Sequence, residues 1–302
     1  SILFNHTVPV EYQFLDERAW VVWLQTLRDF GAVGFFLIAG AVLKRKMLSP
    51  GRVVLPSNLL KLVIAAAALA AFDMLYIAAK GGQVDTVNQH FYKALYDTNL
   101  WFFVAYAIAG PLLLSLDRRG VFWTFLCCLL FVMFPGYTPL ISPYILQTVS
   151  LAFVCMAIGA ELHGRQMNTA VAIAIAATAF LLRTWLDDFG YPAYPAIDVV
   201  LRIVYGVACY MLFKALANAI CRVVNPPGWG NYLFVPYIIQ VPLTIVVTVF
   251  ATALFTRSLQ VRMPPIFFSF WESLAFSLTI FGISLVASFV IAWLLRRYEI
   301  RL

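Results

Sequence analysis

A short basic loop between two long apolar segments constrains the fold of this chain more than any other feature. An apolar segment starting at Gly34 ends in three successive cations, a Ser-Pro-Gly turn and a fourth cation follow, and a second apolar segment begins near Pro56. The four cations are Lys44, Arg45, Lys46 and Arg52. This pattern predicts a hairpin of two membrane helices. The positive-inside rule keeps such a loop on the cytoplasmic side, so it orients the other segments.

Composition supports a membrane protein and argues against a soluble globule. Hydrophobic residues make up 63% of the 302 residues and charged residues only 12%, which leaves too little polar surface to cover a soluble fold. The net charge of +7 is typical of some nucleic-acid-binding proteins, but the basic residues stand at the ends of apolar segments. We therefore attribute them to membrane topology and lipid headgroups, and we expect no nucleic-acid partner.

The apolar segments predict an all-α, polytopic membrane protein with about ten transmembrane helices in a single domain, residues 1–302. The predicted segments are 1–10, 30–43 (after an amphipathic run at 20–29), 55–79, 101–116, 121–134, 140–160, 169–185, 197–220, 232–255 and 266–295. Ten residues rise only about 15 Å, roughly half of the hydrocarbon core, so we expect the first helix to begin before Ser1. No internal repeat typical of transporters is visible.

The charges in the loops agree with one orientation. Counting from the Lys44 loop, the basic turns at Arg118, Arg165 and Arg222 and the basic C-terminus fall on the cytoplasmic side. The acidic residues of the other loops fall on the opposite, outer side; these are Glu11, Asp16, Glu17, Asp85, Asp97, Asp187 and Asp188. This agreement predicts that both termini are cytoplasmic.

Polar residues inside the predicted spans are candidates for function, because lipid disfavours them. They are His6, Lys61, Asp73, Arg202, Lys214 and Glu272. Each has a structural alternative. The two lysines are near enough to cytoplasmic ends to snorkel, Asp73 and Glu272 are near outer ends where water solvates them, and Arg202 can pair with Asp198 one turn earlier.

His6 is the candidate catalyst, since a neutral imidazole is suited to general-base chemistry. The alternative is a core histidine with its hydrogen bonds satisfied. The five cysteines lie in or beside apolar runs without a metal-binding spacing, so neither a metal site nor a disulfide is predicted.

Five stretches in order resemble the acyltransferase 3 family of integral membrane O-acyltransferases, which acylate sugars and peptidoglycan. His6 resembles the family histidine late in the first helix, and GFFLIAGAVLKRK resembles its FF-x-x-SGF helix with basic residues after it. Arg52 to Pro56 resembles the arginine-rich entry to the third helix, and the stretch Asn99 to Phe103 resembles its L-W-F-L. The stretch Gly228 to Pro242 is similar to a late family segment, G-x-x-S-Y-x-x-Y-x-x-H-x-P.

The sequence departs from the family pattern at three of these places. Ala39 stands at the serine of SGF, Arg52 with the more distant Lys61 replaces an arginine pair, and Gln240 replaces the late histidine. These departures affect the details of substrate binding, whereas His6 is kept.

The resemblance implies acyl transfer, most simply of acetyl, from cytosolic acyl-CoA across the membrane to a hydroxyl group of an envelope or extracellular glycan. Acyl-CoA is then a co-substrate, no bound cofactor is expected, and His6 acts as general base or carries the acyl group. The nucleotide phosphates would bind Lys44, Arg45, Lys46, Arg52 and Lys61. The expected substrate path is lined by Trp101, Tyr106, Tyr237, Gln240 and Glu272.

The family resemblance also implies a multi-pass protein of a bacterial inner membrane. Its expected partners are acyl-CoA, a glycan or lipid-linked glycan acceptor, membrane lipids, and a second copy of the chain or a glycan-assembly protein. Charged residues inside membrane segments suit a transporter or flippase for a lipid-linked glycan or acyl donor equally well. A third alternative is a structural subunit of a glycan-assembly complex. A transporter needs neither His6 nor a thioester donor.

Overall fold

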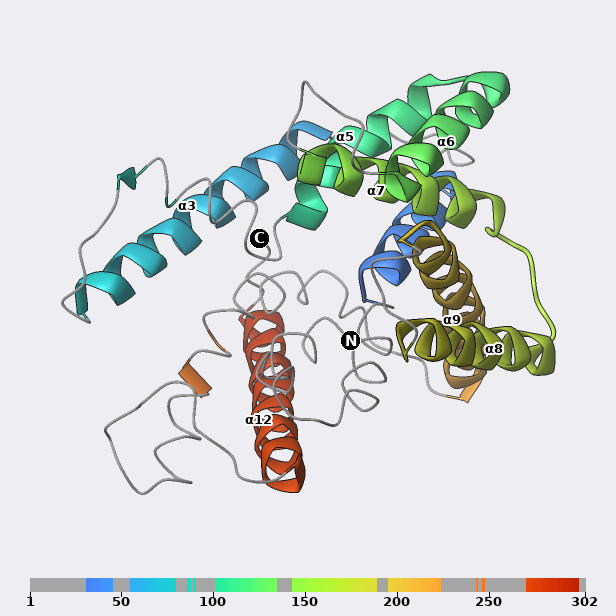
Figure 1. The fold of residues 1–302 in the computed structure, drawn as a ribbon. Helices are drawn as coiled ribbons and strands as arrows, with labels where there is room; N and C mark the ends of the chain where they lie inside the picture. The colour runs from blue at the N-terminus through green and yellow to red at the C-terminus, as the bar shows by residue number, and fades with distance from the viewer. Residues whose placement is uncertain are drawn as a thin grey trace. The chain divides into compact units, whose positions relative to one another are not determined.

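We describe the fold from a computed structural model of the chain. The structure describes residues 31–45, 55–79, 86–87, 90, 101–134, 143–188, 195–223, 243, 246–247 and 270–298. The described residues form eight helices and no strand, which confirms the all-α prediction for this part of the chain. They are helix 31–45, α3 (Leu55–Ala79), α5 (Trp101–Ser115), α6 (Arg118–Met133), α7 (Pro143–Glu161), α8 (Thr169–Asp188), α9 (Pro195–Val223) and α12 (Phe270–Arg297) (Figure 1).

Three of these helices contain a stretch long and apolar enough to cross a membrane. The stretches are Thr169–Leu186 in α8, Ala196–Ala219 in α9 and Leu278–Arg297 in α12. Shorter apolar stretches occupy α3, α5 and α7, at Ala66–Ala79, Phe102–Ser115 and Leu146–Glu161. These helices indicate a membrane protein. The number of about ten spans and the cytoplasmic position of both termini remain predictions.

Several helix ends follow from local chemistry. The Asp117 side chain caps α6, because its Oδ1 accepts a hydrogen bond of 2.8 Å from the Gly120 N–H. This cap explains why α6 begins at Arg118, three residues before the predicted start. Asn168 Oδ1 caps α8 in the same way by accepting from the Ala170 N–H at 2.9 Å. After α7 the chain turns through Gly164, whose φ of +78° favours glycine.

The chain divides into two compact units, which we describe separately. Apart from Ser1, unit 1 comprises Asp16–Leu55 and Phe102–Asn225, and unit 2 comprises Ile2–Leu15, Pro56–Trp101 and Pro226–Leu302. Unit 1 therefore contains helix 31–45, most of α5, and α6 to α9. Unit 2 contains α3 and α12. The prediction of a single domain remains a prediction.

Helix 31–45 is central to unit 1 because it touches α5, α7 and α9. It crosses α7 at two glycines: a Cβ on Gly40 would overlap the Met156 carbonyl, and a Cβ on Gly159 would overlap the Leu37 carbonyl. A Cβ on Gly206 of α9 would likewise overlap the Val33 side chain. Small residues that allow close backbone approach are typical of helix packing in membranes. These glycines therefore set the close packing of helix 31–45 in unit 1.

Other contacts among the described residues of unit 1 join α6 with α7, α8 with α9, and α6 with α9. In Figure 1, α8 and α9 lie side by side. The core is densest where helix 31–45 meets α7, since Phe36, Leu37, Phe153 and Met156 are fully buried there. In unit 2, Ile280 of α12 forms a small buried cluster with Val247, and Leu243 packs on this cluster.

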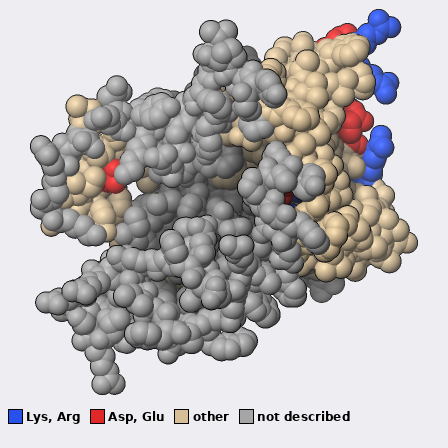
Figure 2. All heavy atoms as spheres, viewed as in Figure 1, with Lys and Arg blue, Asp and Glu red and all other residues tan. Residues whose placement is uncertain are grey.

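The surface of the described helices is largely apolar. Leu75, Trp123 and Val286 belong to three different helices and are 71%, 65% and 63% exposed. Figure 2 shows Lys and Arg side chains, with Asp and Glu side chains between them, along one edge of the described surface, beside a broad area without charges. Large exposed apolar areas are unusual on soluble monomers, and lipid-facing helices require them.

Candidate functional site

Only part of the predicted site lies among the described residues. His6, Lys46, Arg52, Tyr237 and Gln240 lie outside them. Lys61, Trp101 and Glu272 lie in α3, α5 and α12, but the structure describes only their backbone. Lys44, Arg45 and Tyr106 are described with their side chains, and all three belong to unit 1.

Two of the stretches that carry the family resemblance pack together through four phenylalanines. Phe35 lies 5.4 Å from Phe102 and 5.9 Å from Phe103 between ring centroids, and Phe36 lies 5.7 Å from Phe102. Such tilted and edge-on arrangements are favourable for aromatic rings. This phenylalanine cluster, Phe35, Phe36, Phe102 and Phe103, fixes helix 31–45 against the start of α5.

The same two helices carry the three candidate residues that are described with their side chains. Tyr106 lies on α5, and the basic pair, Lys44 and Arg45, lies on helix 31–45. Tyr106 is half-buried on α5, one turn after the phenylalanine cluster, and a Cβ added to Gly110 on the next turn would lie 3.7 Å from Leu43 Cδ1. Lys44 and Arg45 immediately follow Leu43 at the end of the described part of helix 31–45.

Lys214 contributes to the structure of a turn. Its Nζ donates hydrogen bonds to the carbonyl oxygens of Leu162, at 3.2 Å, and Arg165, at 2.7 Å. These carbonyls belong to the turn that follows α7, so Lys214 ties α9 to this turn. The snorkelling alternative for Lys214 remains a prediction.

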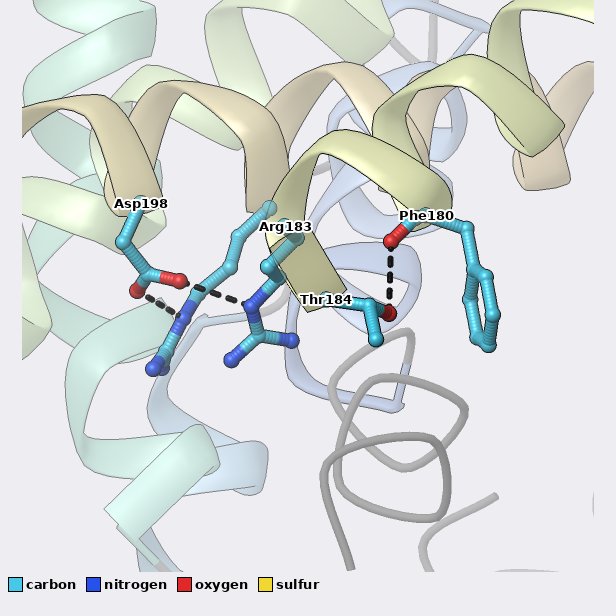
Figure 3. Close-up of polar contacts among 5 residues, drawn as sticks. Phe180, Arg183, Thr184 and Asp198 are labelled. Carbon is cyan, nitrogen blue, oxygen red and sulfur yellow. Dashed lines mark hydrogen bonds and ion pairs between the residues drawn. The ribbon is translucent and has the colours of Figure 1, made fainter. Parts of the chain in front are cut away.

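A buried ion cluster joins α8 and α9 (Figure 3). Arg183 Nε donates a hydrogen bond of 2.7 Å to Asp198 Oδ1, and Arg202 Nε lies 2.6 Å from Asp198 Oδ2. The side chains of Arg183 and Asp198 are only 8% and 7% exposed, and that of Arg202 is 35% exposed. Asp198 also stands in the first turn of α9, where the helix dipole favours a carboxylate. The predicted pairing of Arg202 with Asp198 is confirmed.

A second buried pair lies in unit 2. His90 Nδ1 is 2.7 Å from Asp73 Oδ2, and the His90 side chain is only 3% exposed whereas that of Asp73 is 30% exposed. The backbone N–H of His90 also donates a hydrogen bond of 3.2 Å to the Thr86 carbonyl oxygen, which closes a helical turn. Asp73 is thus partly shielded from solvent and paired with His90. This corrects the interpretation that solvation by water alone explains a carboxylate at this position.

The pairing defines the hydrogen-bonding state of the imidazole. A carboxylate only accepts, so Nδ1 must carry the hydrogen of this contact, and in the neutral ring Nε2 then has a lone pair. His90 Nε2 is buried and has no hydrogen-bond partner in the part of the chain that the structure describes. A carboxylate that orients an imidazole in this way is one half of many acid-base sites.

Two residues of these clusters were missed from the sequence. Arg183 lies near the end of the seventh predicted span. It is 15 residues before Asp198 in the sequence, and such a spacing between two helices predicts no contact. His90 stands in a loop with polar neighbours, where a solvated residue is the ordinary expectation. A weak signal for His90 was Asp73 itself, because an acidic residue in an apolar segment needs a polar partner.

Comparisons with known proteins identify no relative. No protein-family model matches the sequence, and searches of curated proteins and of solved structures gave no match either.

Proposed function

We propose that this protein is a membrane-bound O-acyltransferase. It would move an acyl group, most simply acetyl, from cytosolic acyl-CoA across the membrane to a hydroxyl of an envelope or extracellular glycan. The membrane would be the inner membrane of a bacterium, as the resemblance implies. The described helices support a membrane location, and the activity rests on the resemblance together with the packing of its motifs.

The phenylalanine cluster is the observation that carries this proposal. Two stretches that resemble the family, separated by more than fifty residues, contribute two rings each to one packed contact. Unrelated apolar helices also contain paired aromatic residues, but a shared packing role gives these motifs a reason to occur together. The contact places a helix that carries Lys44 and Arg45 beside a helix that carries Tyr106.

Each residue then has a proposed role. Lys44 and Arg45, with Lys46, Arg52 and Lys61, bind the phosphates of acyl-CoA, since cations at the membrane interface form favourable contacts with phosphate oxygens. Tyr106 lines the route of the pantetheine arm, as do Trp101, Tyr237, Gln240 and Glu272. His6 accepts the hydroxyl proton or carries the acyl group. The roles of residues outside the described part rest on the sequence alone.

The test is acyl transfer from radiolabelled acetyl-CoA by the purified protein in vesicles that also contain a mixed extract of envelope glycans. We expect labelled glycan with the native protein and a loss of about a hundredfold or more with His6→Ala, the usual effect of losing a general base. His163→Ala is the matched control, because it makes the same substitution at a histidine in the turn after α7 that has no role in the proposed reaction. Equal labelling by native protein and His6→Ala would remove His6 from the chemistry.

A transporter or flippase for a lipid-linked glycan or acyl donor is the second candidate. The buried Arg183, Asp198 and Arg202 cluster favours it, because charged groups within membrane segments often mark transport pathways. The two functions differ in their need for a thioester. Movement of a labelled lipid-linked glycan in the absence of acyl-CoA, without any acylated product, would support the transporter.

A further inference from the structure

We propose that Asp73 and His90 form the proton-accepting site for the acceptor hydroxyl. In this site His90 Nε2 binds the hydroxyl of a glycan and takes its proton, while Asp73 holds the imidazole in place. The inference rests on the proposed acyl transfer, which it deepens by assigning a residue to the acceptor side. It assigns the hydroxyl proton to His90, so His6 keeps the other role proposed for it, that of carrying the acyl group.

Geometry and burial support this role. The Asp73 carboxylate holds Nδ1 at 2.7 Å, so the ring presents the lone pair of Nε2 on its other side. Nε2 is buried, and the described residues offer it no partner. Buried polar atoms in folded proteins are nearly always hydrogen-bonded, so a buried nitrogen without a partner among the described residues can accept a hydrogen bond from a water molecule or from a ligand. A hydroxyl group supplies the donor that this nitrogen lacks.

The position of Asp73 along α3 fits an acceptor on the outer side. Asp73 is 18 residues after Leu55, about 27 Å along the helix, and six residues before its end at Ala79, about 9 Å. In the predicted topology α3 starts beside the cytoplasmic basic loop and ends at the outer side. The pair then lies near the outer membrane interface, where an envelope glycan is encountered, and far from the face that acyl-CoA approaches.

The chemical step balances with groups that the proposed reaction supplies. The acceptor oxygen attacks the acyl carbonyl carbon, and a new C–O bond forms while the hydroxyl proton passes to His90 Nε2. The bond from the acyl carbon to its carrier, a nitrogen of His6, breaks with its electron pair. The carrier finally takes up the proton from His90, directly or through water. No oxidant, reductant or metal is required.

A purely structural pair is the main alternative to this assignment. In that case Asp73 and His90 would only fasten a loop residue to α3, and their loss would lower stability without a specific effect on transfer. The conservative variants His90→Gln and Asp73→Asn keep size and polarity. His163→Gln is the matched control, since it removes a half-buried histidine from unit 1.

Rate measurements provide the first test. With radiolabelled acetyl-CoA and the mixed glycan extract, we expect His90→Gln to lower kcat about a hundredfold and Asp73→Asn about tenfold, because general-base catalysis contributes factors of this size. KM for acetyl-CoA should stay within twofold of the native value, and His163→Gln should behave as native. A His90→Gln protein that transfers label within threefold of the native rate would overturn the assignment.

A binding measurement separates this inference from the proposed function. The chain has three histidines, so ¹⁵N-histidine NMR of the native protein in vesicles gives a simple spectrum, and His90→Gln identifies the His90 signals. We expect His90 to carry a hydrogen on Nδ1, and an Nε2 signal that moves when the glycan extract is added. Asp73→Asn should weaken this preference for Nδ1, because an Asn side chain can either accept from Nδ1–H or donate to an Nδ1 that carries no hydrogen.

The two hypotheses can fail separately. If glycan moves the Nε2 signal but the native protein transfers no label, the acyl transfer is refuted and the hydroxyl site stands. An Nε2 signal that does not respond to glycan, or a hydrogen on Nε2, would overturn the site whatever the transfer assay shows.

Discussion

Replacing Asp198 with Asn should destabilise the protein strongly, because it removes the negative charge from a buried ion cluster. Asp198 contacts Arg183 at 2.7 Å and Arg202 at 2.6 Å, and the Arg183 side chain is only 8% exposed. Breaking a buried ion pair by removing one partner costs about 3–5 kcal/mol, since it leaves a buried charge uncompensated. We expect the lower part of this range, about 3 kcal/mol, because Arg202 is 35% exposed and retains solvent.

The chain offers a matched control on its surface. Glu161 and Arg165 lie 3.6 Å apart, but their side chains are 73% and 68% exposed. Exposed pairs contribute about 0–1 kcal/mol, so Glu161→Gln should have little effect. The two substitutions are of the same chemical kind, a carboxylate changed to an amide, and they differ mainly in burial.

The assay is reversible unfolding of the purified protein in mixed detergent micelles, followed by tryptophan fluorescence. A double-mutant cycle with Arg183→Gln isolates the contribution of the pair and should give a coupling of about 1–3 kcal/mol. Equal free energies of unfolding for Asp198→Asn and Glu161→Gln, or a coupling near zero, would refute the view that burial makes this cluster important.

Two further predictions concern helix packing and the basic pair. Gly40→Ala should lower the free energy of unfolding by about 2 kcal/mol, because its Cβ meets the Met156 backbone, which cannot move aside easily. Gly282→Ala is the control, because a Cβ there meets nothing within 4 Å. The higher helix propensity of alanine should therefore stabilise α12 by about 0.5–1 kcal/mol. If both variants changed the free energy of unfolding in the same direction, the close crossing of helix 31–45 and α7 at Gly40 would be contradicted. Lys44→Gln with Arg45→Gln should raise KM for acetyl-CoA about tenfold, equivalent to about 1.4 kcal/mol, with kcat little changed. The double variant Arg118→Gln with Arg119→Gln removes two exposed cations from the start of α6, and an equal rise in KM would show a general charge effect.

The helices could be predicted well because apolar segments ending in charges, prolines and glycines carry a local signal. The third predicted segment coincides with α3 at Leu55–Ala79, and the fourth differs from α5 by one residue at its end. The differences elsewhere have local causes. Pro195 opens α9 two residues before the predicted start, as expected for a proline at the first helical position, and Asp117 moves the start of α6.

Contacts between helices were harder to predict because they depend on how helix faces meet. The Asp198 and Arg202 pair was predicted, since residues four apart share a helix face. The partner of Asp198 on α8 was not, because a spacing of 15 residues across a turn specifies no contact. The same holds for Asp73 and His90, and for the Gly40 crossing, where the sequence shows a small residue but not the carbonyl it approaches.

Little of the candidate catalytic site could be tested by geometry. His6, on which the proposed chemistry depends, lies outside the described residues, and of the five predicted phosphate-binding cations only Lys44 and Arg45 are described with their side chains. The phenylalanine cluster links two family-like stretches, whereas the pair formed by Asp73 and His90 emerged only from the structure.

Transfer across a sealed membrane tests the central claim most directly. Native protein is reconstituted into vesicles that contain radiolabelled acetyl-CoA, and the glycan extract is added only outside. The acyltransferase account predicts labelled glycan in the outer solution, and none with vesicles that lack the protein. Intact labelled acetyl-CoA inside the vesicles with no labelled glycan outside, in a preparation shown to contain folded protein in both orientations, would contradict it.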